Sequence, residues 1–264
     1  MKIAAIGDPH GNLEKIRRIP LENVDLALIT GDLGEADLLR KLVFQYLSAT
    51  EKGLLNRNPY ADNFKQAFLR SYETALKLVS HITGYCPVFM VRGNADISNY
   101  DTRKFSRKFN IDLPFLYDSL QTISGVRLID NKIAYFQGIK IGGLKYFTDI
   151  SWAEEFELAS IDKIRKRALW ETEKAERILN RFGTVDILVT HVPPYGIMDR
   201  VNSKITPLSW IGRNAGSKTI LEYIKQKRPG YVFCGHIHEG EGIVKWGETE
   251  IYNLGAGGYR IIEL

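Results

Sequence analysis

Two histidines one residue apart, His236 and His238, follow a short apolar run near the end of the chain. The run, residues 231–234, is typical of a buried strand, so both imidazoles would leave the strand end together, just after Gly235. Neutral imidazole is the commonest nitrogen ligand for transition metals in proteins. The pair therefore suggests a metal site, although a solvated surface turn has the same local pattern.

Four earlier apolar runs predict further buried strands, and each is followed by side chains that can bind a metal. In chain order these side chains are Asp8, His10, Asp32, Asn94 and His191. In open α/β sheets, ligands bind outside the carboxyl ends of the strands, so all five strand ends can converge on one crevice. With the two later histidines there are seven nitrogen and oxygen donors, too many for one tetrahedral ion and suitable for two ions that share a carboxylate.

Such a pair of ions has a defined chemistry. Two divalent ions about 3.5–4 Å apart can clamp a phosphate and lower the pKa of a bridging water toward neutrality. The resulting hydroxide can attack phosphorus in line. The residue types and their positions therefore predict metal-dependent hydrolysis of a phosphoester.

The composition is that of a soluble globular protein, with 44% apolar and 25% charged residues among 264. Cys86 and Cys234 lie in apolar runs and are predicted to be buried thiols, so no disulfide framework is expected. The chain starts directly with a strand pattern instead of the zones of a signal peptide, and no apolar run reaches the ~18 residues of a membrane helix. We therefore expect a cytoplasmic protein with no membrane partner. The net charge of +5 favours anionic partners without distinguishing phosphate substrates from nucleic acid.

Hydrophobic periodicity predicts the elements that would carry the candidate ligands. Buried strands are predicted at residues 2–8, 25–30, 87–92, 185–190 and 231–234, and short antiparallel strands within 126–143 and 242–262. Helices are predicted at residues 12–19, within 35–82, and at 154–182 and 217–226. Strands that alternate with helices indicate an α/β fold with parallel strands. Because the donors extend from Asp8 to His238, we predict a single domain, 1–264, with a helical insert at about 35–82.

The ordered motifs Asp-x-His, Gly-Asp, Gly-Asn-x-Asp, His and Gly-His-x-His resemble those of the calcineurin-like metallophosphoesterase family. The resemblance covers nearly the whole chain. Residues 190–194 (Thr-His-Val-Pro-Pro) and 235–240 (Gly-His-Ile-His-Glu-Gly) further resemble a subgroup of predicted phosphodiesterases with His-x-Pro-Pro and Gly-His-x-His-Glu-Gly motifs. The resemblance implies a four-layer αββα sandwich of two mixed sheets flanked by helices.

Carried over by position, the resemblance also implies two metal sites. One ion would be held by Asp8, His10, Asp32 and His238. The other would be held by Asp32, Asn94, His191 and His236, so that Asp32 bridges the two ions. The cofactors would be two divalent metal ions, and the sequence leaves Mn, Fe, Zn, Ni and Mg open.

The chain departs from the family at one position. Where most members have Gly-Asn-His followed by an acidic residue, this chain has Ala95. The histidine is credited with protonating the leaving group or steadying the transition state, and general acid catalysis contributes about 10²–10⁴-fold. The absence of this histidine favours substrates with acidic leaving groups. The candidate catalytic residues are then Asn94, Asp96 and His191, with Asp96 expected to hydrogen-bond a supporting group instead of the substrate.

A long irregular loop is predicted from residue 193 to residue 213, directly after His191. We predict that Arg200 and Arg213 in this loop contact the substrate phosphate together with Asn94. The predicted function is hydrolysis of a small phosphoester, with a phosphodiester favoured and nucleotide-derived substrates included. A nuclease on the same metal core and a catalytically weak binding scaffold of the same fold are the alternatives. Nucleic acid is the weaker choice of partner, and a homo-oligomer is left open.

Overall fold

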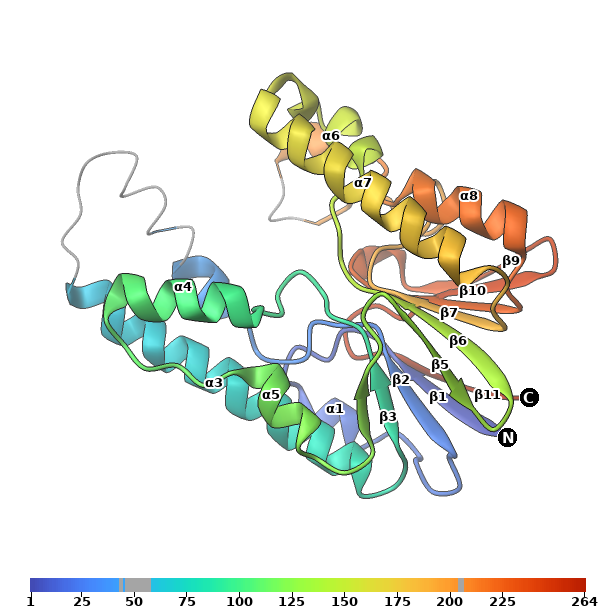
Figure 1. Cartoon of the computed structure of the whole chain (residues 1–264), viewed down its shortest axis with the longest axis horizontal. Coiled ribbons are helices and arrows are strands. Elements are labelled where there is room, and N and C mark those ends of the chain that lie inside the picture. Colours follow the sequence, from blue (N-terminus) through green and yellow to red (C-terminus); the bar gives the residue numbers. More distant parts are fainter. Residues whose placement is uncertain (43–44, 46–57, 204–206) are drawn as a thin grey trace.

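The computed structural model describes residues 1–42, 45, 58–203 and 207–264 (Figure 1). Two mixed sheets pack face to face at the centre, and helices cover the outer face of each sheet (Figure 1). The predicted αββα sandwich is therefore confirmed. None of the helices in the described ranges combines the length and apolarity needed to cross a bilayer.

The first sheet has the strand order β11-β1-β2-β3-β4. Its strands are β1 (Lys2–Ile6), β2 (Leu26–Ile29), β3 (Val88–Met90), β4 (Val126–Leu128) and β11 (Tyr259–Glu263). β1 to β4 run parallel to one another, and β11 pairs antiparallel with β1. Because both faces of the sheet are covered, β2 and β3 are apolar at every position. The parallel arrangement brings the residues that follow β1, β2 and β3 to one edge.

The second sheet has the order β5-β6-β7-β8-β10-β9. Its strands are β5 (Lys132–Phe136), β6 (Ile139–Leu144), β7 (Ile187–Thr190), β8 (Tyr231–Cys234), β9 (Gly242–Trp246) and β10 (Thr249–Asn253). β6, β7, β8 and β10 are parallel, and the outer strands β5 and β9 pair antiparallel with their neighbours. The ends of β7 and β8 carry His191 and the His236–His238 turn.

Three apolar clusters hold the layers together. The central cluster joins side chains of both sheets, such as Leu28 and Phe233. A second cluster packs α1 (Leu13–Ile16), α3 (Asn58–Thr83) and α5 (Leu116–Gln121) on the first sheet. A third packs α7 (Asp162–Phe182) and α8 (Lys218–Lys227) on the second sheet.

The predicted helical insert divides into two parts. Its C-terminal part, within α3, packs on the first sheet as the covering helix between β2 and β3. Its N-terminal part packs on α4 (Asn99–Phe109), where the ring of Phe64 lies 4.8 Å from Phe105 and 4.9 Å from Phe109 between centroids. Residues 37–42 are helical as well, whereas most of the break expected near residues 53–59 lies outside the described residues. The single-domain organisation stays a prediction.

Helix boundaries differ from expectation in two places. The helix predicted over residues 154–182 is interrupted, because α6 (Ile150–Glu155) and a 3₁₀ turn (Leu158–Ser160) precede α7. The interruption falls at Glu157, whose φ of 60° is left-handed and cannot continue a right-handed helix. The helix α4 was not predicted from its basic sequence. It begins at the Ser98 cap and buries aromatic side chains against α3.

Candidate metal centre

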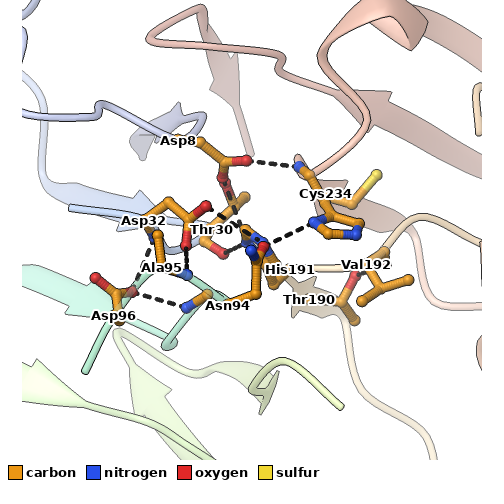
Figure 2. Close-up of polar contacts among 12 residues, drawn as sticks. Asp8, Thr30, Asp32, Asn94, Ala95, Asp96, Thr190, His191, Val192 and Cys234 are labelled. Carbon is orange, nitrogen blue, oxygen red and sulfur yellow. Dashed lines mark hydrogen bonds and ion pairs between the residues drawn. The ribbon is translucent and has the colours of Figure 1, made fainter. Parts of the chain in front are cut away.

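Figure 2 shows the residues that the strand ends bring together. Asp8 follows β1, Asp32 follows β2, Asn94 follows β3 and His191 follows β7, and all four point toward one another. The side chains of Asp8, Asp32 and His191 are almost completely buried. The predicted convergence of donors from both sheets is therefore present in the fold.

A first group of donors consists of Asp8, His10 and His238. His238 Nε2 lies 3.2 Å from Asp8 Oδ2, and His10 Nε2 lies 3.4 Å from His238 Nε2. His10 Nε2 is also 3.8 Å from Asp32 Oδ2. Three side chains, two that follow β1 and one that follows β8, thus direct a nitrogen or oxygen to the same place.

A second group centres on the amide oxygen of Asn94. His191 Nε2 and His236 Nδ1 each lie 2.8 Å from Asn94 Oδ1. Asp32 Oδ2 is 3.7 Å from His191 Nε2. The same Asp32 oxygen that faces His10 therefore also faces this second group, which is the position a bridging carboxylate would need.

The donors fit metal ions better than they fit one another. His10 Nδ1 is buried without a hydrogen-bond partner in the described part of the chain, while its Nε2 faces another imidazole nitrogen. His191 Nδ1 lies 3.0 Å from the carbonyl oxygen of Thr30, so the neutral ring with its proton on Nδ1, the form that binds metal, leaves the Nε2 lone pair directed at the oxygen of Asn94. A cation between such atoms would satisfy them, and mixed imidazole and carboxylate donors suit divalent transition metals. The residue-by-residue ligand assignment remains a proposal.

The backbone at this site adopts uncommon conformations. His10, Asp32 and His236 have φ values of 44°, 47° and 66°, in the left-handed region. Such a conformation costs about 1–3 kcal/mol for a residue other than glycine, and it concentrates at functional sites. The strained backbone thus occurs at residues whose side chains turn into the crevice.

Two glycines allow the carboxylates to lie close to the neighbouring backbone. A Cβ on Gly93 would lie 2.1 Å from Asp32 Oδ1, and a Cβ on Gly235 would lie 2.3 Å from Asp8 Oδ1. No side chain fits at these distances. The glycines in the Gly-Asn and Gly-His motifs are thus explained by space beside the two aspartates.

Burial and neighbouring charges shift the protonation of the donors. Burial alone would lower the pKa of His191, but the carboxylates of Asp8 and Asp32 outweigh it and raise that pKa to about 9. Burial and the proximity of His191 lower the pKa of His236 to about 3. Burial would raise the pKa of Asp8, yet His191 and hydrogen bonds from the two later histidines hold it well below its usual range. In the metal-free protein at neutral pH, His191 therefore holds a proton beside the ionised Asp8.

Asp96 connects the two ligand loops. Its Oδ2 accepts hydrogen bonds from the backbone N–H of Asp32 (2.8 Å) and of Gly93 (2.7 Å), and its Oδ1 accepts one from Leu33 (3.0 Å). Burial and the charge of Asp32 raise the pKa of Asp96 to about 6. The supporting hydrogen bonds expected for Asp96 are present. Next to it, Ala95 donates its N–H to Asp32 Oδ1 at 2.7 Å and offers no side-chain proton.

The two arginines predicted to bind substrate lie in the loop after β7. The Arg213 guanidinium donates to the carbonyl oxygen of Glu155 and lies 2.8 Å from a carboxylate oxygen of Glu157. Arg200 is exposed, and its backbone forms an isolated bridge with Asn214. Their contact with substrate stays a prediction, and for Arg213 it would compete with its existing partners.

A cavity of about 320 Å³ beside Asn94 carries cations that sequence reasoning did not single out. The basic residues in its wall are Arg92, Lys145, Arg167 and Lys174. No motif marks them, because they come from the end of β3, the end of β6 and the middle of α7. Only the packing of these elements places them next to the donor groups.

The four-layer sandwich and the two donor groups at its strand ends are the features that the resemblance to the metallophosphoesterases implied. The chain belongs to the calcineurin-like phosphoesterase family, whose sequence model matches residues 1–240. Members of this family use a dinuclear metal centre, for which Asp8, His10, Asp32 and His191 are candidate ligands here.

Individual relatives are distant. A UPF0046 protein of Caenorhabditis elegans is 26% identical over 136 residues, which are 51% of this chain and 41% of that protein. Metallophosphoesterase domain-containing protein 1 of Homo sapiens is 36% identical over 70 residues, 26% of this chain and 19% of that protein. The matched regions thus span less than half of either relative. The solved structure of phosphopantetheinyl hydrolase from Mycobacterium tuberculosis aligns over 97% of this chain and 89% of its own, with a TM-score of 0.53 at 14% identity, a likeness of fold.

Proposed function

We propose that the protein hydrolyses a phosphodiester with the help of two divalent metal ions. The observation that carries the proposal is the position of Asp32, whose Oδ2 faces His10 of the first donor group and His191 of the second. One carboxylate between two sets of nitrogen donors is the arrangement that a pair of ions requires. When bound, the two ions would polarise the phosphoryl oxygens and lower the pKa of the attacking water.

The chain's own residues supply position and orientation. Asp8 and Asp32 bring negative charge that attracts the cations, and the Thr30 carbonyl oxygen orients His191 by accepting a hydrogen bond from its Nδ1–H. Asp96 fixes the backbone of the two loops that carry Asp32 and Asn94. The amide oxygen of Asn94 turns toward the histidines, which leaves its amide nitrogen to donate to a phosphoryl oxygen. Asn94 would then act both on the metal and on the substrate.

The identity of residue 95 supports esters with acidic leaving groups. Alanine cannot protonate the departing alcohol, so the leaving group must depart as an anion or take its proton from water. Anhydrides and diesters of acidic alcohols lose least from this absence. Small nucleotide-derived diesters are included in this class, and Mn²⁺ is the first metal to test among Mn, Fe, Zn, Ni and Mg.

Hydrolysis of bis(p-nitrophenyl) phosphate beside p-nitrophenyl phosphate tests the proposal, on metal-stripped protein that is given back Mn²⁺. We expect metal-dependent turnover that favours the diester. Asp32→Asn should reduce turnover at least about 10²-fold, because it removes the charge shared by the two donor groups. Asp62→Asn is the matched control, since Asp62 is an exposed residue of α3. A folded Asp32→Asn protein with wild-type turnover would refute the mechanism.

A further inference from the structure

The cavity beside Asn94 lies next to the donor groups, so the part of a substrate beyond the reacting phosphate could enter it. Gly93 and Asn94 form its wall next to the donor groups. Tyr146 also lines it, with a ring centroid 5.8 Å from that of His191 and 5.5 Å from that of His236. A further wall comes from α7. A molecule whose phosphate binds at the donor groups can therefore extend directly into this cavity.

The two arginines in the cavity wall already have carboxylate partners. Arg92 donates to Asp130, and its guanidinium lies over the ring of Tyr117 at 5.1 Å. Arg167 Nε lies 2.8 Å from a carboxylate oxygen of Glu171. These pairs neutralise both guanidinium groups, so neither arginine needs a ligand.

The two lysines differ from the arginines. Among the described residues, neither Lys145 nor Lys174 forms a hydrogen bond or an ion pair with a carboxylate, and Lys174 only lies 4.9 Å from the ring centroid of Trp170. The Lys145 side chain is half-buried. Burial and the nearby charges of Arg92 and Lys174 lower the pKa of Lys145, and the carboxylates of Asp130 and Glu171 offset this only in part. A half-buried ammonium that no carboxylate contacts directly is unfavourable unless an anion binds to it.

The acidic groups in the cavity wall make their hydrogen bonds and ion pairs with groups other than the two lysines. Asp96 accepts its hydrogen bonds from backbone N–H groups of the ligand loops. Glu171 accepts one from the backbone N–H of Thr148 at 2.6 Å in addition to its arginine. Asp101 accepts one from the Ser98 hydroxyl at 2.6 Å at the start of α4. The lysines therefore remain available to a ligand.

We propose that Lys145 and Lys174 form a subsite for a second anionic group of the substrate, a phosphate or a carboxylate carried by the half of the molecule that is not attacked. The inference rests on the proposed function, because it takes the donor groups as the binding place of the reacting phosphate. It narrows the substrate class to phosphoesters with a second acidic group a few bonds away. Lys145 has the central role because it is the more buried of the two.

Three phosphonates with three-carbon tails that differ chiefly in charge test this subsite. Propylphosphonate has a neutral tail, 3-phosphonopropionate an anionic tail and 3-aminopropylphosphonate a cationic tail. Calorimetric titration of the Mn²⁺-loaded protein should give about tenfold tighter binding for the anionic tail than for the neutral tail, and the weakest binding for the cationic tail. This readout measures binding and does not depend on turnover.

Lys145→Met keeps most of the apolar stem and removes the charge, so it should reduce the tenfold preference to within about twofold. Lys174→Ala should reduce it partly, and Lys145→Glu should reverse it. Lys245→Ala, at an exposed lysine of β9, is the control that should keep the preference.

Equal affinities for the neutral and anionic tails would overturn the subsite, as would a preference that persists in folded Lys145→Met. The second result would mean that the carboxylate chelates the metal. Failure of the proposed function has a different signature, namely no metal-dependent hydrolysis of either nitrophenyl ester by wild-type protein. A tail preference in that case would still support the anion subsite.

Discussion

Asp32 is a residue on which the candidate site depends strongly, since one of its oxygens, Oδ2, faces both His10 and His191. Its own position depends on others. Asp96 holds the Asp32 backbone, and Ala95 donates its N–H to the Asp32 carboxylate. At the residue scale, the site is thus a network in which the candidate ligands are oriented by neighbours that do not bind metal.

Ala95→His should raise turnover selectively for substrates with poor leaving groups. Ala95 lines a cavity of about 240 Å³ next to Asn94, so there is space beside it for an imidazole. A general acid at this position is worth about 10²–10⁴-fold where proton transfer limits the rate, and little where the leaving group is acidic. We expect the substitution to raise the turnover of phenyl esters at least tenfold more than that of p-nitrophenyl esters. The slope of rate against leaving-group pKa measures this difference. Ala95→Gln, which adds size without a general acid, should leave that slope unchanged.

The stability of the metal-free protein should decrease as the pH rises from about 7 to 9. The folded pKa of His191, about 9, is above the usual 6.5. The folded state therefore keeps a proton that the unfolded state loses over this window, so the stabilisation is complete below about pH 6.5 and is lost toward pH 9. The full effect is about 3 kcal/mol at most. Urea unfolding in EDTA at both pH values measures it. His191→Gln should flatten the dependence, and a wild-type free energy of unfolding that rises over the window would contradict the charge assignment.

At the scale of elements, parallel strands determine where the donors can meet. β1, β2 and β3 end at one edge of the first sheet. β7 and β8 end at the edge of the second sheet that lies opposite this one. Four of these strands, β1, β2, β3 and β8, pass into a turn with a left-handed residue or a glycine. These turns, more than the strands, set the distances between the ligand atoms.

Gly235→Ala should weaken metal binding by at least about tenfold, although it changes no ligand. The added methyl group would lie 2.3 Å from Asp8 Oδ1, so the carboxylate or the β8 turn has to move. Displacement of a supporting group typically costs about 10–100-fold in metal affinity. Competition with a chromogenic chelator measures this affinity. Gly230→Ala, where the new methyl group would meet only the carbonyl oxygen of Asp186 at 3.4 Å, should bind metal like wild type. Equal affinity of the two variants would refute the close-approach argument.

At the scale of the whole molecule, the two sheets share one apolar interior, and the helices seal the outer faces (Figure 1). The α3–α4 layer and the α6–α7 layer extend beyond the sheets. α4 contributes Asp101 and α7 contributes Lys174 to the cavity beside the candidate metal centre. The covering layers therefore contribute to the shape of the space that a substrate would enter.

The two cysteines should react with a thiol reagent only when the whole fold opens. Cys86 and Cys234 are buried, and burial raises the pKa of Cys86 to about 11. The nucleophilic thiolate is therefore scarce and inaccessible at pH 8. Titration with Ellman's reagent should find both thiols in guanidinium chloride and almost none in the native protein. Rapid reaction of one thiol in the native protein would mean that its layer opens locally.

The sequence determined the buried strands, the donors that follow them and their order along the chain. These features are local, since a continuous apolar run indicates a doubly covered strand and a histidine after it can be recognised wherever it occurs. The glycines beside Asp8 and Asp32 are part of the same local motifs. The family resemblance extended this local information to the αββα arrangement, which the structure confirms.

Only the tertiary structure decided which distant side chains share a wall. Lys145 and Lys174 come from different elements, and no periodicity relates them. The helix α4 could not be predicted from its basic surface, because only its contact with α3 shows that its aromatic face is buried. The interruption at Glu157 likewise depends on how α6 and α7 pack against each other. Local sequence determines residue chemistry and strand type, whereas the neighbours of a side chain depend on packing between segments far apart in the chain.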